Sequence, residues 1–400
     1  MKPVTVPPPG RVRLAALPPL TLYLHVPWCL KKCPYCDFNS HEARGEVPES
    51  RYVDAVVRDL EASVPRVWGR RVHAIFVGGG TPSLFSAKAI DRLLTAARTL
   101  LTVEPDAEIT LEANPGTFEQ EKFRDFRAAG VNRLSVGIQS FDDERLRAIG
   151  RVHDAGEARR AVEIALATFD NVNLDLMYAL PGQSVEAALA DIRTAIGFAP
   201  QHLSAYHLTL EPNTVFHRYP PALPDDDSAA AMQEAIEAAL AQAGYGHYET
   251  SAFAKPGRGS RHNLNYWRFG DYLGVGAGAH GKLSFADRVT RETRLRQPKA
   301  YQDAALAGDA IQESRDVPAA ELPFEFLMNA LRLAEGFAIP LFAERTGLTL
   351  AAVEAPLAKA QAAGLLERDA FAIRPTPLGR RFLNDLLGLF LPQARSPRKV

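Results

Sequence analysis

The sequence predicts an α/β fold: a partial (β/α)6 barrel followed by a smaller α+β domain. Between residues 21 and 210, short β-rich apolar runs alternate with amphipathic helical stretches, and Gly-, Pro- or Asn-bearing turns separate them. Such alternation predicts right-handed βαβ units on a parallel sheet. Six units are two short of a full eight-fold barrel, so we expect a curved, open sheet.

Each predicted element has a residue range. The strands cover residues 21–26, 73–77, 108–112, 133–138, 172–177 and 202–210, and the helices lie near 49–63, 86–100, 118–129, 155–168 and 184–197. Polar and glycine-rich residues follow the strands. In barrels of this type the site lies at the C-terminal strand ends, so we expect the candidate site residues on one rim.

The chain divides into four predicted segments. Residues 1–20 form a mobile Pro-rich leader, 21–225 the barrel, 226–392 a C-terminal domain and 393–400 a basic tail. The C-terminal domain has helical patterns, a hairpin near 364–373, and a helix start at Thr376 followed by Pro377. Helices with a hairpin suggest a winged-helix-like module.

Composition limits the function classes. The 400 residues carry a formal net charge of −1, which argues against a broad nucleic-acid-binding surface, so we expect no nucleic-acid partner. No run is apolar enough to span a bilayer, and the first twenty residues lack the apolar core of a secretory signal. We therefore expect a reducing cytoplasmic location.

All three cysteines stand in one short window, as Cys29, Cys33 and Cys36. Thiolates hold iron–sulfur clusters, normally four to a cluster, so three on one loop leave one iron of a cubane open to a small molecule. A structural zinc site needs four closed ligands, and a disulfide framework needs an even count and an export context. The pattern favours a [4Fe-4S] cluster.

Around this triplet the chain resembles the radical S-adenosylmethionine (SAM) superfamily, and within it the HemN/HemW branch. The resemblance rests on segments 22–29, 78–83, 111–116, 134–139 and 175–182, and covers about residues 20–390. It implies a TIM-like radical SAM barrel with a winged-helix-like C-terminal domain, a [4Fe-4S] cluster on the three cysteines, and SAM at the open iron.

The resemblance also implies residues for the cofactor. Glycines in segment 78–80 let backbone approach the methionine amino group, Glu112 suits the amine or the ribose hydroxyls, and two tyrosines flank the cluster and adenosine. The full implied set for SAM is Tyr23, Tyr35, Gly79, Gly80, Thr81, Glu112, Gln139, Arg151 and Asp175. The role of His25 stays open.

Three features separate two groups of this branch, the HemN radical decarboxylases of porphyrin propionates and the HemW heme chaperones. Phe38 stands where the HemN type has a further cysteine, the segment before the first strand is short, and residues 262–267 resemble the His-Asn-x-x-Tyr-Trp heme motif. Imidazole and phenol groups can ligate heme iron, so His262 and Tyr266 are the heme-binding candidates. Residue types alone favour the alternative, a hydrogen-bonded pair of His262 and Tyr266 at the domain junction.

The resemblance therefore favours a heme chaperone using [4Fe-4S] and SAM over radical turnover. The alternatives are an oxygen-independent coproporphyrinogen III dehydrogenase and, from a different class, a winged-helix regulator that senses heme or iron. The implied partners are heme and recipient heme proteins, including respiratory, membrane-bound ones, with peripheral membrane contact. Monomer and homodimer both stay open.

Overall fold

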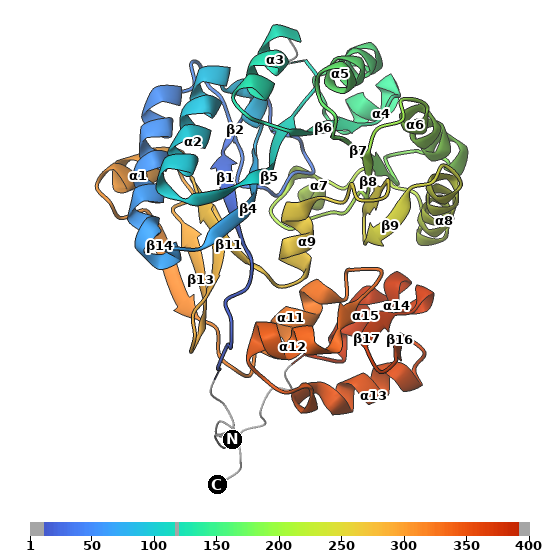
Figure 1. The fold of residues 1–400 in the computed structure, drawn as a ribbon. Coiled ribbons are helices and arrows are strands. Elements are labelled where there is room, and N and C mark those ends of the chain that lie inside the picture. Colours follow the sequence, from blue (N-terminus) through green and yellow to red (C-terminus); the bar gives the residue numbers. More distant parts are fainter. Residues whose placement is uncertain (1–11, 117–119, 392–400) are drawn as a thin grey trace.

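The centre of the fold is a parallel sheet in the computed structural model, which describes residues 12–116 and 120–391. Its six first strands are β1 (Leu20–Val26), β4 (Arg71–Gly79), β5 (Thr102–Ala113), β6 (Arg133–Gln139), β7 (Val172–Tyr178) and β8 (His202–His207). They pair in this order, each parallel to the next (Figure 1). The predicted partial barrel is confirmed. Strand β5 begins six residues earlier than predicted.

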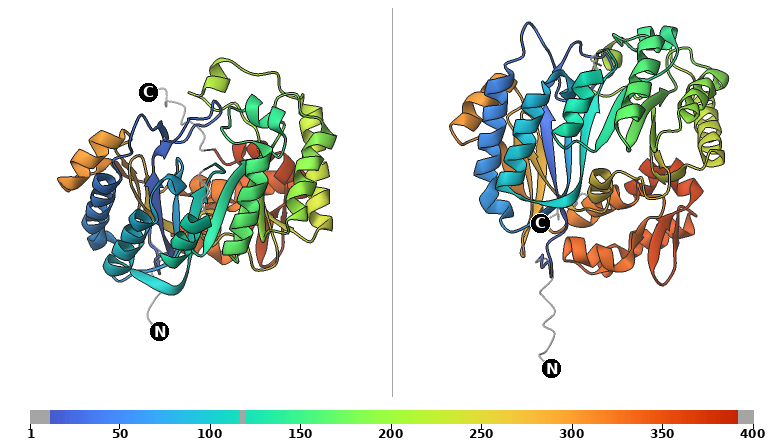
Figure 2. Two further views of the ribbon diagram at one scale, coloured as in Figure 1. Left: turned by 90° about the horizontal axis from the view of Figure 1, so that it is seen from above. Right: turned by 45° about the horizontal axis from the view of Figure 1, so that its top comes forward.

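Helices cover the outer face of this curved sheet (Figure 2). They are α1 (Glu49–Val67), α2 (Ala87–Leu100), α3 (Gln120–Ala128), α4 (Asp143–Ala148), α5 (Ala155–Thr168) and α6 (Val185–Gly197). Capping side chains fix several starts: Ser86, Asp154 and Ser184 each accept a hydrogen bond from a backbone N–H of the first turn. The apolar faces of these helices pack on the sheet and form one core with it. This packing leaves the C-terminal strand ends free for the site.

The sheet continues beyond residue 225, where the sequence predicted the barrel to end. Strand β11 (Asp271–Val275) pairs in parallel with β1, and β12 (His280–Ser284), β13 (Val289–Arg294) and β14 (Ile311–Asp316) follow it in antiparallel order. At the other edge lie β10 (Ala252–Ala254) and β9 (Gly246–Glu249). The result is an open twelve-stranded sheet. Helix α8 (Asp226–Gln242) packs on α6, and α10 (Pro298–Leu306) on α1.

A separate C-terminal module follows β14 and has its own apolar core. It contains α11 (Leu322–Ala330), α12 (Ile339–Thr346), α13 (Glu354–Ala362), α14 (Pro377–Arg381), α15 (Leu383–Gly388) and a small sheet of β15 (Phe337–Ala338), β17 (Ala372–Pro375) and β16 (Leu366–Arg368). The predicted hairpin is β16–β17. Thr376 caps α14 through its side chain, with Pro377 in the first turn.

Six short elements complete the described residues. They are β2 (Trp28–Cys29), β3 (His41–Glu42), the 3-10 turns Pro82–Leu84 and Leu350–Val353, α7 (Val215–Arg218), and the seven-residue α9 (Arg261–Trp267). In Figure 1, α9 lies between the barrel and the C-terminal module, below the strands. It is therefore placed to contact both parts of the molecule.

The end of the predicted leader packs into the C-terminal module. Leu14 is buried in that module's core, and its N–H donates to the carbonyl oxygen of Ala286 at 3.0 Å. The remaining leader residues 1–11 and the predicted tail 393–400 lie outside the described residues. Within the described ranges, no helix combines the length and the apolar character needed to cross a bilayer.

Candidate functional site

A cavity of about 470 Å³ runs from the C-terminal ends of the strands into the barrel. Eleven of the fourteen predicted site residues line it: Cys29, Cys33, Tyr35, Cys36, Gly79, Gly80, Thr81, Glu112, Gln139, Arg151 and Asp175. Tyr23, His262 and Tyr266 do not. At its deep end the cavity reaches Asn263 of α9, so one space connects the cysteine loop with the helix that carries His262.

The three cysteines lie on one loop at the mouth of this cavity, and all three are half-buried free thiols. Burial raises the pKa of the Cys29 and Cys36 thiols, so a bound metal must drive their deprotonation. In the part of the chain described, no three His, Cys, Asp or Glu side chains converge on one ion position. A cubane takes one thiolate on each iron, so three separate thiols facing one cavity fit a cluster.

The glycine loop (residues 78–81) at the end of β4 holds the cysteine loop (residues 29–36) through backbone hydrogen bonds near its start. The N–H groups of Gly80 and Thr81 donate to the carbonyl oxygens of Val26 and Trp28, both at 2.7 Å. A Cβ atom at Gly80 would lie 2.5 Å from the Trp28 oxygen. Glycine is therefore required here for a close approach of two backbones, one of which continues into Cys29.

Glu112, at the end of β5, lies beside the same glycine loop. Its Oε2 accepts a hydrogen bond from the Gly79 N–H at 3.0 Å. Burial raises the pKa of Glu112 to about 8; the Gly79 bond opposes that rise and nearby Asp175 adds to it. The group is thus a buried acid that a cationic ligand, such as an amine, would ionise.

Arg151 ties the cysteine loop to β5 and β6. Its Nη2 donates to Asn114 Oδ1 and to the Gly137 carbonyl oxygen, both at 2.7 Å, and its Nη1 lies 3.6 Å from Cys33 Sγ. Nearby Gln139 has φ of 68°, a left-handed conformation that is uncommon outside glycine. Such conformations gather at functional sites, where the surrounding structure holds them.

Asp175 on β7 belongs to a buried polar group. Its carboxylate accepts hydrogen bonds from Ser135 Oγ at 2.9 Å and from Asn173 Nδ2 at 2.8 Å. Burial raises the pKa of Asp175, while hydrogen bonds from Asn173, Ser135 and Ser204 oppose the rise. All four side chains line the cavity. A ligand bound there would therefore contact Asp175 and change its protonation.

Tyr23, predicted to flank the cluster, lies deeper in the barrel. Its hydroxyl donates to His25 Nδ1 at 2.9 Å, and its ring faces Phe76 with ring centres 6.2 Å apart. His25 Nε2 in turn donates to the Asn39 carbonyl oxygen at 2.9 Å. Burial lowers the pKa of His25 to about 4, so this histidine is a neutral, hydrogen-bonded core residue.

His262 faces the barrel interior from α9. Its ring centre is 5.0 Å from that of Phe76, its side chain is buried, and its Nδ1 has no hydrogen-bond partner. Burial lowers the pKa of His262 to about 3, which leaves a neutral imidazole. Tyr266 packs on Trp267 and Tyr272 instead, with ring centres 5.0 and 4.9 Å away. The two heme-motif candidates therefore have separate partners.

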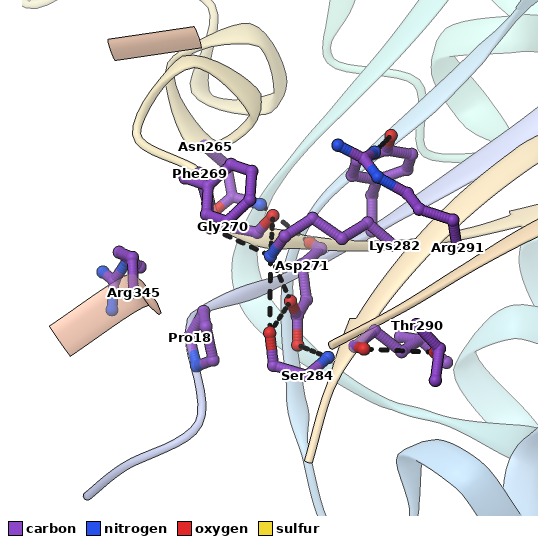
Figure 3. Close-up of polar contacts among 12 residues, drawn as sticks. Pro18, Asn265, Phe269, Gly270, Asp271, Lys282, Ser284, Thr290, Arg291 and Arg345 are labelled. Carbon is purple, nitrogen blue, oxygen red and sulfur yellow. Dashed lines mark hydrogen bonds and ion pairs between the residues drawn. The ribbon is translucent and has the colours of Figure 1, made fainter. Parts of the chain in front are cut away.

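Both ends of α9 are held by buried polar groups. At its start, Ser260 Oγ accepts from the Asn263 N–H and Glu108 Oε1 accepts from the Arg261 N–H at 2.8 Å. Figure 3 shows the other end, where Lys282 points at the chain leaving the helix. Lys282 Nζ donates to the Phe269 carbonyl oxygen at 3.1 Å and to Asp271 Oδ1 at 2.9 Å.

Several cavity residues were not predicted. Asn114, Arg133, Ser135, Asn173, His202 and Tyr206 all line the same space. The available signal was strand alternation: positions two residues apart face the same side of a strand. Applied from Asp175 and Gln139 backward along β7 and β6, it would have selected Asn173, Ser135 and Arg133.

An open parallel barrel with three cysteines at its mouth defines the radical SAM class. The radical SAM superfamily model matches residues 23–195, and the HemN C-terminal domain model matches residues 317–382. The structure is similar to that of the Escherichia coli coproporphyrinogen III oxidase HemN, a radical SAM enzyme, with a TM-score of 0.79, 25% sequence identity and coverage of 94% of this chain and 90% of that one.

Curated relatives narrow the class. The chain is 50% identical to the heme chaperone HemW of Escherichia coli (strain K12) over 382 residues, 95% of this chain and all of that protein. It is 47% identical to the HemW of Haemophilus influenzae, over 94% of this chain and 99% of that protein. The chain belongs to the HemW family of radical SAM proteins.

Proposed function

We propose that the chain is a heme chaperone, which binds heme and transfers it to recipient heme proteins. One observation carries the proposal: the match to the Escherichia coli heme chaperone HemW, at 50% identity, covers 95% of this chain and all of that protein. The chain has Phe38, a half-exposed cavity residue, two positions after Cys36. This disfavours the alternative, a coproporphyrinogen dehydrogenase, whose type has cysteine there.

The cavity suits the cofactors that the family implies. Cys29, Cys33 and Cys36 would hold a [4Fe-4S] cluster, and SAM would lie between the glycine loop, Glu112 and Asp175. When bound, cluster and SAM supply a one-electron cleavage of the sulfonium bond. The residues of the chain position the ligand: Glu112 and Asp175 accept its polar hydrogens, Arg151 holds the loop, and the barrel wall excludes water.

The iron content of reconstituted protein tests the cluster. Anaerobic reconstitution is expected to give about four irons per chain, because a cubane uses three thiolates and leaves one open site. Cys33→Ala is expected to lower iron content and change the visible spectrum. Unchanged iron and spectrum in Cys33→Ala would show the ligand assignment to be wrong.

Heme titration tests the chaperone proposal. Wild type is expected to bind heme stably at micromolar concentration, and His262→Ala to lose at least ten-fold in affinity, about 1.4 kcal/mol. His153→Ala is the matched control, because His153 is also buried with an unpartnered Nδ1. It lies near Arg151 and not on α9, so its loss is expected to leave heme affinity unchanged. Conversion of coproporphyrinogen III by reconstituted protein, without stable heme binding, would contradict the proposal.

The remaining assignments extend the same proposal. Because His262 is buried in this conformation, its ligation of heme iron requires α9 to leave the barrel wall. We also propose a cytoplasmic location with peripheral contact to membranes that carry recipient heme proteins. Specific duplex binding with steep salt dependence would instead favour a regulator.

A further inference from the structure

A continuous chain of hydrogen bonds joins the cofactor cavity to the start of α9. Asp175 accepts from Asn173 Nδ2 at 2.8 Å, and Asn173 Oδ1 lies 2.6 Å from His202 Nδ1. His202 Nε2 lies 2.7 Å from the hydroxyl of Tyr248, which accepts from the Ser260 N–H at 3.3 Å. We call these five residues the polar chain.

The direction of every bond in the polar chain is fixed. Asn173 uses Nδ2 as donor to Asp175, so its Oδ1 accepts from His202 Nδ1–H. Burial lowers the pKa of His202 far below its ordinary value, so the ring is neutral and its Nε2 accepts the Tyr248 hydroxyl hydrogen. Each donor therefore points toward Asp175, and each bond polarises the next.

The polar chain borders the cavity at Asn173 and His202, but these two side chains are almost fully buried. Asn173, His202 and Ser260 are buried, so loss of a hydrogen bond there costs part of the desolvation of a polar atom. Ser260 is also the N-cap of α9, and its side chain accepts a hydrogen bond from the Asn263 N–H. His262 follows two residues later. The far end of the polar chain is thus the start of the heme-motif helix.

We propose that His202 and Tyr248 are positioning residues that couple occupancy of the cofactor cavity to the seating of α9, so that SAM and heme bind antagonistically. The inference rests on the proposed function for the identity of the two ligands. A ligand hydroxyl or amine at Asp175 favours the ionised carboxylate, which is the stronger acceptor. The polar chain then holds Ser260 more firmly, and His262 stays against the barrel.

Amide hydrogen exchange over residues 258–268 tests the coupling without heme. In ligand-free protein, Tyr248→Phe removes one hydroxyl and is expected to speed exchange in this segment at least five-fold. Asp175→Asn is also expected to speed exchange there. In reconstituted wild type, SAM is expected to slow exchange in this segment, whereas in Tyr248→Phe it has no effect.

Tyr245→Phe is the matched control. Tyr245 is a buried tyrosine whose hydroxyl donates to the Pro200 carbonyl oxygen at 2.7 Å, outside the polar chain. Its loss is expected to leave exchange over 258–268 unchanged. Unchanged exchange in Tyr248→Phe, or an equal rise in Tyr245→Phe, would overturn the coupling.

Heme titration with and without saturating SAM gives the second measurement. Wild type and Tyr245→Phe are expected to bind heme at least five-fold more weakly with SAM, a typical size for coupling between sites. Tyr248→Phe is expected to bind heme equally in both conditions. Equal heme affinity in wild type with and without SAM overturns the coupling but not the chaperone. Absence of heme binding refutes the chaperone, and the exchange experiment still decides the coupling.

Discussion

Burial shifts the pKa values of single residues in the barrel interior, because their hydrogen bonds and charged neighbours do not replace the lost contact with water. Glu112 has one backbone donor, and its nearest charged neighbours include Asp175 and Arg133. Burial raises the pKa of Glu112 to about 8, and lowers that of His262 to about 3. In ligand-free protein at neutral pH, the acid is thus mostly protonated and the imidazole neutral.

The pH dependence of stability tests Glu112. Its pKa is raised in the folded state, so its stabilising contribution is full below about pH 4.5 and is lost as pH rises through about 8. Relative to Glu112→Gln, the free energy of unfolding of ligand-free wild type is expected to fall by about 2 kcal/mol between pH 6 and pH 8. Urea unfolding at both pH values measures this difference.

Glu144→Gln is the control for this experiment, because the Glu144 side chain is 73% exposed. Its stability difference from wild type is expected to be the same at pH 6 and pH 8. If the difference in free energy of unfolding between wild type and Glu112→Gln is the same at pH 6 and pH 8, the carboxyl of Glu112 does not titrate in this range.

At the scale of elements, α9 is too short to be stable by itself. Seven residues give few helical hydrogen bonds against a costly nucleus, so tertiary contacts must hold it. Ser260, Glu108 and Tyr248 contact its start, and Lys282 holds the chain that leaves it. Such a helix is suited to move as a unit when one end is released.

Lys282→Met tests the clamp at the end of α9. Lys282 is buried, its Nζ is 2.9 Å from Asp271, and it lies over the Phe269 ring. Removing it leaves Asp271 with Arg70 as its direct ion-pair partner, at 2.8 Å. The free energy of unfolding is expected to fall by about 3 kcal/mol, measured by urea unfolding followed by tryptophan fluorescence.

The exposed pair of Arg288 with Asp287 supplies the comparison. Arg288→Met is expected to cost less than about 1 kcal/mol, because exposed ion pairs contribute little. A Lys282→Met protein as stable as Arg288→Met would show that the buried pair does not hold this end of the helix.

The whole molecule has two main apolar cores that meet near α9. Phe269, just after α9, belongs to the core of the C-terminal module, whereas His262 faces the barrel. Leu14 from the N-terminal segment enters the same C-terminal core. Residues far apart in the chain therefore join the module that supports the heme-motif helix.

Leu14→Ala tests this arrangement. Leu14 is buried, so truncation leaves a cavity, and the free energy of unfolding is expected to fall by about 2 kcal/mol. Leu17→Ala, at a side chain 46% exposed, is expected to change it by less than about 0.5 kcal/mol. Equal effects of the two substitutions in urea unfolding would contradict the packing of Leu14 in this core.

The sequence by itself predicted the six βα units, the cluster role of the three cysteines, and eleven of the residues that line the cavity. The strands and helices follow from local causes, such as apolar periodicity and the helix start at Thr376. The cofactor residues follow from the resemblance to the radical SAM superfamily and from the position of each motif after a strand. Parallel strands bring their C-terminal ends to one edge, so residues in separate motifs converge without knowledge of the rest.

Only the tertiary structure shows which contacts join the second half of the chain to the first. Strand β11 pairs with β1, Leu14 fills a distant core, and the polar chain joins Asp175 on β7 to Ser260 before α9. These contacts depend on chain topology and on side chains from separate elements, which no local period encodes. The resemblance also predicted His262 as a heme ligand, but only the fold places its imidazole inside the barrel, where burial keeps it neutral and contacts at both ends of α9 hold the helix.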